Sequence, residues 1–294
     1  MTAKMLDIVD QAGKSVSGEN LKNDIKILFT DIDGTLLNSD NTLSPLNMQT
    51  LIKAKEKGIK IVLATGRPVF SVQGVIGEQL KKNDLKLFPG IYLNGCITYD
   101  ENGKKIIDHV ISDELKMDIH NFTKKKNFDQ YCIWYTADQT FCFSINEEIK
   151  NYMNVESVSP KIINEETFKT LKVYKVLMCL NEQNMSSIFQ SCKDLFAHKI
   201  NVANTFMYYI ELFHQKTNKF EGVKKICDNY NISLNNALVI GDGENDIEML
   251  QGVPTSVAPS NASDKVKSCA KYIGPSNNDA VVSQALQRFC GVHP

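Results

Sequence analysis

Two aspartates separated by one residue follow a short apolar segment early in the chain. Residues 25–30 predict a buried strand, and the sequence DIDGT occupies positions 31–35 directly after it. In an extended chain residues i and i+2 project to the same side, so both carboxylates can converge beyond the carboxyl end of the strand. Ligands of open α/β sheets bind at that edge. The pair alone suits acid–base chemistry or a hard cation, and an acidic turn without chemistry is the structural alternative.

A second acidic cluster follows another predicted strand late in the chain. Residues 237–240 are apolar, and the sequence GDGEND at 241–246 comes next and opens a predicted helix. We therefore expect Asp242 and Asp246 at the same sheet edge as Asp31. Asp31 and Asp242, together with a main-chain carbonyl, would make an oxygen site with positions left for water, which suits Mg²⁺. Alternatively, Asp242 and Asp246 could serve only to cap the N-terminus of the helix.

Two further segments offer groups that bind anions. The sequence TGRP at 65–68 ends a predicted strand, and Pro68 suits the first turn of a following helix. This arrangement would present Thr65 and nearby backbone N–H groups to an anion, although a plain strand-to-helix turn has the same appearance. Lys219 lies among other lysines. A single lysine is usually a solvated helix residue, and only the position of Lys219 relative to the other motifs singles it out.

The elements that must position these residues alternate between strand and helix at both ends of the chain. Buried strands are predicted over residues 25–30, 59–64, 90–93 and 237–240. A helix is predicted over 44–57, with Ser44 as its N-cap, Pro45 in its first turn and Gly58 as its stop. Such alternation is typical of a parallel α/β sheet.

The middle of the chain has a different pattern. A hairpin is predicted over 97–111, and two alternating segments, 130–135 and 140–144, flank a second turn. We therefore predict an α/β fold in which a Rossmann-like core with a parallel sheet is interrupted by an inserted α+β cap domain. The predicted ranges are 1–24 for a loose N-terminal leader, 25–95 and 214–294 for the core, and 96–213 for the cap.

Length, charge and cysteine usage restrict the class of protein. The 294 residues suggest about two domains, each able to bury its own core. With 33 basic and 34 acidic residues the formal charge is −1, which argues against a nucleic-acid or anionic-membrane partner. Eight scattered cysteines without a CxxC pair predict reduced thiols in a cytoplasmic protein. We find neither an apolar stretch of 18 residues nor a secretory signal, so no membrane span is expected.

The four elements, taken together and in this order, resemble the haloacid dehalogenase (HAD) superfamily of phosphohydrolases. They are DIDGT at 31–35, Thr65, Lys219 and the GDxxND pattern at 241–246. The sequences ATGR at 64–67 and NG at 94–95, with an insertion between Thr65 and Lys219, are similar to the Cof-type branch, which has a large α/β cap. The resemblance covers about residues 25 to 290.

The resemblance implies a role for each matching residue. Asp31 would be the catalytic nucleophile and Asp33 the general acid and base. The implied substrate- and phosphate-binding residues are Thr65, Gly66, Arg67, Asn94, Lys219 and Asn245. The implied metal site for Mg²⁺ contains Asp31, Asp33 through its carbonyl, and Asp242, with Asp246 also at the metal site and Asn245 in support.

We therefore expect a Mg²⁺-dependent phosphatase that hydrolyses small phosphorylated metabolites, most of all sugar phosphates, through an aspartyl phosphate. A phosphomutase of the same superfamily is the nearest alternative, because it would use the same two aspartates. A regulatory module that is merely phosphorylated on Asp31 is a third possibility, but such a module would not need the insertion. Inward side chains of the cap would select the substrate.

Overall fold

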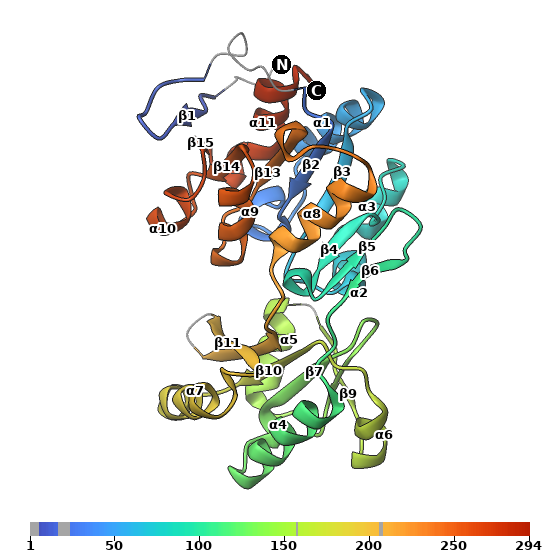
Figure 1. Cartoon of the computed structure of the whole chain (residues 1–294), viewed down its shortest axis with the longest axis vertical. Helices are drawn as coiled ribbons and strands as arrows, with labels where there is room; N and C mark the ends of the chain where they lie inside the picture. The colour runs from blue at the N-terminus through green and yellow to red at the C-terminus, as the bar shows by residue number, and fades with distance from the viewer. Residues whose placement is uncertain (1–5, 17–23, 157, 206–207) are drawn as a thin grey trace. The chain divides into compact units, whose positions relative to one another are not determined.

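The structure, a computed structural model, describes residues 6–16, 24–156, 158–205 and 208–294 (Figure 1). The chain forms two compact units. The first comprises Met1–Gly66, Ile76–Ile107 and Asn218–Pro294, and the second comprises Arg67–Val75 and Asp108–Thr217. The second unit is therefore made of two pieces of chain that interrupt the first.

The first unit is built on a nine-stranded sheet with a parallel centre. The strand order is β1-β15-β14-β13-β2-β3-β4-β5-β6. The strands are β1 (Val9–Asp10), β2 (Ile27–Thr30), β3 (Lys60–Ala64), β4 (Gly90–Tyr92), β5 (Ile97–Tyr99), β6 (Lys105–Asp108), β13 (Ala237–Ile240), β14 (Thr255–Pro259) and β15 (Tyr272–Gly274). All neighbours from β15 to β4 are parallel, whereas β1 and β5 pair antiparallel at the two sides. The predicted α/β class is confirmed.

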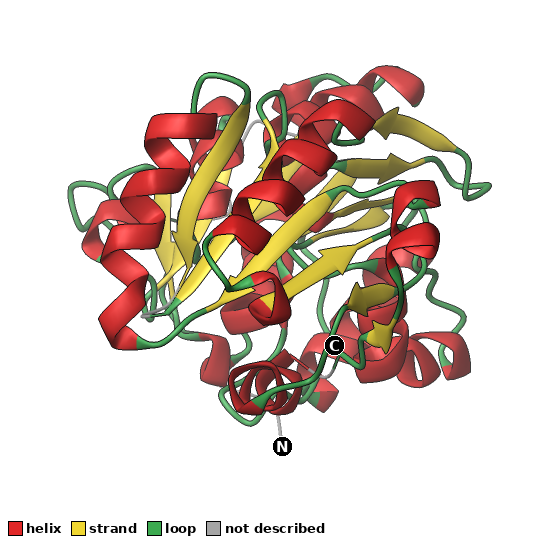
Figure 2. Cartoon of the chain, turned by 90° about the horizontal axis from the view of Figure 1, so that it is seen from below, coloured by secondary structure: helices red, strands yellow, loops and turns green. Residues whose placement is uncertain are grey.

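Helices pack beside the strands of this sheet (Figures 1 and 2). The helices of the first unit are α1 (Pro45–Glu56), α3 (Glu78–Lys82), α8 (Lys219–Asn229), α9 (Ile247–Gly252), α10 (Asp264–Lys267) and α11 (Val281–Cys290). Residues of α8, α9 and α10 share one apolar cluster with Ile27 and Phe29 of β2, and this burial supplies most of the driving force for packing. The first helix begins as predicted, because the Ser44 hydroxyl accepts a hydrogen bond from the Asn47 N–H at 3.1 Å.

The second unit is an α+β structure on a six-stranded sheet of order β11-β12-β10-β7-β8-β9. Its strands are β7 (Cys132–Tyr135), β8 (Thr140–Cys142), β9 (Lys161–Ile162), β10 (Lys175–Cys179), β11 (Ile200–Thr205) and β12 (Tyr209–His214). Its helices are α2 (Val69–Val72), α4 (Asp113–Lys125), α5 (Glu147–Glu156), α6 (Glu165–Thr170) and α7 (Glu182–Phe196). Trp134, Val176 and Leu212 are fully buried in a core to which α4 and α7 contribute Ile119 and Cys192. This sheet is antiparallel except where β8 pairs with β9.

The boundary of the second unit differs from the prediction. The predicted cap began at residue 96, but β5 and β6 extend the nine-stranded sheet of the first unit. Residues 97–99 pair with β4, so their main-chain hydrogen bonds hold the hairpin to that sheet. At the other end the second unit continues to Thr217 rather than residue 213, and Arg67–Val75 also belongs to it. A hairpin pattern predicts the two strands but not the sheet that they join.

The predicted loose leader is partly structured. Within the predicted range 1–24, Val9 and Asp10 form β1 and pair with β15, and Ile8 is fully buried. A strand of two residues is too short to produce a periodic pattern, which is why the sequence does not reveal it. Residues 1–5 and 17–23 lie outside the described part of the chain.

All eight cysteines are free thiols, and six of them are buried. Among the described residues, no helix combines the length and the apolar character that a membrane span requires.

Candidate active site

Four neighbouring parallel strands end beside one another, and a predicted site residue follows each of them. Asp31 follows β2, Thr65 follows β3, Asn94 follows β4, and Asp242 comes shortly after β13. Because the pairs β13–β2, β2–β3 and β3–β4 are all parallel, these segments meet at one sheet edge. Asp31 is held there by its backbone N–H, which donates to the carbonyl of Ile240 at 2.9 Å.

The chain turns sharply just after Asp31. Asp33 has φ −78° and ψ 126°, and Gly34 has φ 72° and ψ 0°, which are the dihedral angles of a type II turn. The positive φ favours glycine at position 34. A Cβ atom there would also lie 2.2 Å from Oδ2 of Asp242, so a larger residue would displace that carboxylate. Gly34 thus allows the turn to approach Asp242 closely.

Lys219 links two of the buried carboxylates. It is the first residue of α8, and the side chain of Asn218 caps that helix by accepting from the Glu221 N–H at 2.8 Å. The Nζ atom of Lys219 donates to Oδ1 of Asp31 at 2.7 Å and to Oδ1 of Asp246 at 2.6 Å. Burial alone would lower the pKa of Lys219, but the two carboxylates outweigh it and hold the pKa above its ordinary value. Lys219 therefore remains a cation inside the protein.

Negative charge exceeds positive charge at this point. Carboxylate oxygens of Asp31, Asp242 and Asp246 lie within 4.8 Å of one another, and among the described residues the ammonium of Lys219 bonds to two of these three groups. Burial raises the pKa of Asp31 well above its ordinary value; Lys219 opposes this rise and the neighbouring carboxylates add to it. Burial likewise raises the pKa of Asp242 to about 6. A cluster of oxygen donors with uncompensated charge is suited to a hard divalent cation.

Asp246 has partners for both of its carboxylate oxygens. Oδ1 accepts from Lys219, and Oδ2 accepts from the backbone N–H of Gly243 at 2.9 Å. The residue is fully buried. Asp246 is one of the three carboxylates that could hold a metal ion, and these contacts also place it to hold Lys219 beside Asp31.

The predicted phosphate-binding residues other than Arg67 lie in the first unit. Thr65 is buried, its N–H donates to the carbonyl of Ile91 at 2.9 Å, and its own carbonyl accepts from the Asn94 N–H at 3.0 Å. Nδ2 of Asn245 donates to Oδ1 of Asn94 at 2.8 Å. A Cβ on Gly66 would lie 2.8 Å from the same Asn94 oxygen. Thr65, Gly66, Asn94 and Asn245 are therefore close neighbours.

Arg67 lies in the second unit and not in the core, to which the prediction assigned residues 25–95. Nη1 of its guanidinium donates to the Ser71 hydroxyl and to the Glu156 carbonyl, each at 3.1 Å. The same atom lies 3.7 Å from the Glu156 carboxylate. Pro68 is the N-cap of α2 rather than a residue of its first turn. These contacts join α2 to the end of α5 within the second unit, a pairing of distant residues that the local sequence does not indicate.

Thr35 also contacts the acidic cluster, a role that was not predicted for it. Its hydroxyl donates to Oδ1 of Asp242 at 2.7 Å, and it is fully buried. Its place at the end of the DIDGT segment is the one feature of the sequence that could have indicated this contact. The bond orients one oxygen of Asp242, and it opposes the rise that burial causes in the pKa of that residue.

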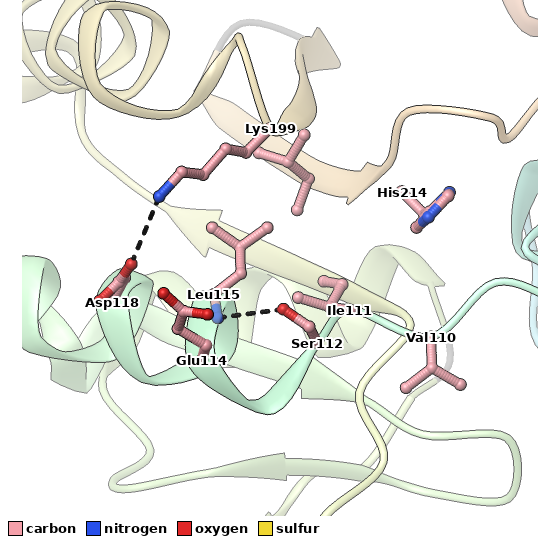
Figure 3. A pocket seen from close by; sticks show the side chains of 9 residues that line it. Val110, Ile111, Ser112, Glu114, Leu115, Asp118, Lys199 and His214 are labelled. Atoms are coloured by element: carbon pink, nitrogen blue, oxygen red, sulfur yellow. Dashed lines mark hydrogen bonds and ion pairs between the residues drawn. The ribbon is translucent and has the colours of Figure 1, made fainter.

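The second unit contains a pocket of its own with a volume of about 330 Å³ (Figure 3). The side chain of Lys199 extends toward Asp118, with 3.8 Å between Nζ and Oδ2. The lining residues are Val110, Ile111, Ser112, Glu114, Leu115, Asp118, Lys199, Ile200 and His214. None of them is among the predicted site residues, so this pocket is not the centre where the carboxylates gather.

Replacing Asp242 with asparagine should stabilise the metal-free protein at pH 8. Because burial raises the pKa of Asp242 from 3.8 to about 6, the folded state binds more protons than the unfolded state between those values. The wild type therefore loses stability as the pH rises through this window, whereas the amide cannot ionise and still accepts from Thr35. We expect the variant to melt about 2–4 °C higher at pH 8, with the difference disappearing near pH 4. Scanning calorimetry in the presence of a chelator measures both values; an equal difference at the two pH values would contradict the assignment.

Comparison with known proteins agrees with this arrangement. The family model of haloacid dehalogenase-like hydrolases matches residues 28–286. The protein M6_Spy0533 of Streptococcus pyogenes is 27% identical over 271 residues, which cover 90% of this chain and 98% of that protein. The 5-amino-6-(5-phospho-D-ribitylamino)uracil phosphatase YwtE of Bacillus subtilis is 25% identical over 292 residues. The match covers 90% of this chain and 98% of YwtE.

A solved structure extends the likeness to the fold. A Plasmodium vivax protein described as HAD/COF-like has a TM-score of 0.84 and 28% identity, covering 92% of this chain and 97% of that chain. The family match covers most of the chain, including every strand-end segment described above. The chain belongs to the haloacid dehalogenase-like hydrolases, in their Cof-type branch, and is a phosphoric monoester hydrolase.

Proposed function

We propose that this enzyme requires Mg²⁺ and releases inorganic phosphate from small phosphorylated metabolites, with sugar phosphates as the leading class. The observation that carries the proposal is the buried Asp31 carboxylate, bonded to Lys219 at 2.7 Å beside Asp242 and Asp246. The substrate class is supported by the name of the relative YwtE, which acts on a phosphorylated ribityl chain, a reduced sugar. We also propose a cytoplasmic location, in keeping with eight free thiols.

The donor set fits Mg²⁺. Asp31 and Asp242, with the main-chain carbonyl of Asp33, would hold the ion, and the excess of carboxylates over Lys219 leaves charge for it to offset. Bound there, Mg²⁺ would neutralise part of the negative charge on the phosphoryl oxygens. Asp246 would complete the acidic cluster at the metal site and hold Lys219 beside Asp31.

The chain's own residues would divide the reaction into two displacements. In the first, an oxygen of Asp31 forms a bond to phosphorus, the ester P–O bond breaks, and Asp33 donates a proton to the departing oxygen. In the second, Asp33 removes a proton from water, whose oxygen attacks the aspartyl phosphate and regenerates the Asp31 carboxylate with inorganic phosphate. One carboxyl group can serve both steps because it is returned to its starting protonation state.

Lys219 and the neighbouring polar residues would hold the phosphoryl group. A phosphate dianion repels an anionic nucleophile, so a buried ammonium next to Asp31 lowers the cost of bringing the two together. Thr65, Gly66, Asn94 and Asn245 are close neighbours and would supply hydrogen bonds to the phosphoryl oxygens. Arg67, whose guanidinium contacts Ser71 and Glu156, stays a predicted substrate-binding residue.

The proposal is tested by measuring phosphate release from a panel of sugar phosphates, nucleotides and pyridoxal phosphate. We expect multiple turnovers with Mg²⁺, a loss of roughly 100-fold or more after exhaustive chelation, and recovery when Mg²⁺ is restored. Ca²⁺ should support turnover poorly because its coordination is looser. Undiminished turnover after chelation would contradict the metal requirement. Isomerised substrate with little free phosphate would indicate a phosphomutase, and a single phosphorylation without turnover would indicate a regulatory module.

A further inference from the structure

Two asparagines from the last part of the chain bond to the main chain that follows the catalytic aspartates. Nδ2 of Asn261 donates to the carbonyl of Gly34 at 2.9 Å. Oδ1 of Asn261 accepts from the backbone N–H of Asn277 at 2.9 Å. Nδ2 of Asn277 in turn donates to the carbonyl of Leu37, also at 2.9 Å. The pair thus holds both ends of the segment 34–37.

The orientation of the Asn261 side chain is set by its partner. Asn261 is exposed, but Asn277 is buried and lies in the 3₁₀ turn Asn277–Asp279, so its N–H is a fixed donor. With Oδ1 of Asn261 occupied by that N–H, Nδ2 is left to donate to Gly34. The two hydrogen bonds therefore fix the orientation of the Asn261 amide.

We infer that Asn261 is a positioning residue that holds the turn carrying Asp33. Asp33 is joined directly to Gly34, whereas Asp31 lies three residues before Gly34 and is held by the Ile240 carbonyl and by Lys219. Asp33 lies in the turn itself, one peptide before the carbonyl that Asn261 binds. Loss of the Asn261 amide should therefore disturb Asp33 more than it disturbs Asp31.

A larger disturbance of Asp33 than of Asp31 predicts a specific kinetic effect. This prediction rests on the proposed role of Asp33 in protonating the leaving group. A basic sugar alkoxide needs that proton, whereas a nitrophenolate leaves readily without it. In N261A, we expect the rate of phosphoenzyme formation from a sugar phosphate to fall by about 10- to 100-fold, in line with a small misplacement of a reacting group. With p-nitrophenyl phosphate the rate of this first step, measured as a pre-steady-state burst, should fall by less than about 3-fold.

A second measurement does not depend on activity. Hydrogen exchange of backbone amides in residues 31–37 of the metal-free protein should be about 10-fold faster or more in N261A than in the wild type, because the turn opens more easily. The matched control is N278A. Asn278 is also an exposed asparagine that bonds to this part of the chain, accepting from the Ser39 N–H at 2.9 Å, but its contact lies beyond the segment 34–37. N278A should leave both the exchange of residues 31–37 and the substrate preference unchanged.

The two measurements separate the possible failures. Unchanged exchange in N261A, or an equal increase in N278A, would overturn the claim that Asn261 fixes the turn. Faster exchange with equal rate losses on both substrates would overturn the link to Asp33. A wild-type protein that releases no phosphate from any substrate would count against the proposed function, while the exchange result would still decide whether Asn261 holds the turn.

Discussion

Replacing Asp31 with asparagine is expected to abolish the phosphoenzyme and to lower turnover by roughly 10⁴-fold or more, the scale of effect seen when a nucleophile is removed. The amide is a poor nucleophile and carries no charge for the metal. Its carbonyl oxygen can still accept the hydrogen bond that Lys219 donates to Asp31 at 2.7 Å, so the packing around it should be preserved. The loss should therefore be chemical rather than structural.

The measurement is the labelling of the protein by a phosphorylated substrate in a rapid acid quench. An acyl phosphate survives acid and is removed by hydroxylamine, so wild-type label should show both properties. D84N is the matched control, because Asp84 is an exposed aspartate that pairs with Lys55 at the surface of the first unit. Circular dichroism and the melting temperature verify that D31N is folded. Normal hydroxylamine-sensitive label in D31N would refute the assignment of Asp31.

Replacing Asp33 with asparagine is expected to slow the reaction in a way that depends on the leaving group. Asp33 lies two residues after Asp31, the proposed nucleophile, in the turn beside the cluster, and is proposed to protonate the departing oxygen. General acid assistance contributes about 10²- to 10⁴-fold in rate, or roughly 3 to 5 kcal/mol. Phosphoenzyme formation should therefore slow far more with a sugar phosphate than with p-nitrophenyl phosphate. The water step should also slow, so phosphoenzyme should accumulate with the aryl substrate.

Pre-steady-state bursts on the two substrates measure this difference. D33N should show a burst with p-nitrophenyl phosphate and almost none with the sugar phosphate, because formation is then the slow step. The wild type supplies the reference rates for both. Equal losses in the rate of phosphoenzyme formation would mean that Asp33 serves the metal or the turn, and that the proton-transfer role is wrong.

Local features of the sequence account for most of the fold's central elements. The apolar segments before Asp31 and Asp242 form β2 and β13, and Ser44 caps α1 as its position predicts. These features depend on residues a few positions apart, so their physical causes are visible in the sequence. The hairpin β5–β6 was also predicted, but its membership in the nine-stranded sheet depends on pairing with β4, and a periodic pattern is the same in either sheet.

The site shows the same division between local and distant causes. The order of residues along the chain tells which polar groups follow which strands. The parallel arrangement of those strands then brings Asp31, Thr65, Asn94 and Asp242 to one edge. The bond between Lys219 and Asp31 joins residues 188 positions apart, and the bond from Asn261 to Gly34 spans 227.

The hydrogen-bond partner of each polar group depends on how distant parts of the chain pack together. Asp246 bonds to Lys219 and Gly243 through its two oxygens, and Arg67 bonds to Ser71 and Glu156, and none of these partners could be read from the local sequence. Hydrogen bonds and ion pairs are short-range and directional, so their choice depends on positions accurate to a fraction of an ångström. Side-chain spacing along one strand or helix predicts which edge a group reaches, but the packing of the whole unit determines what it meets there.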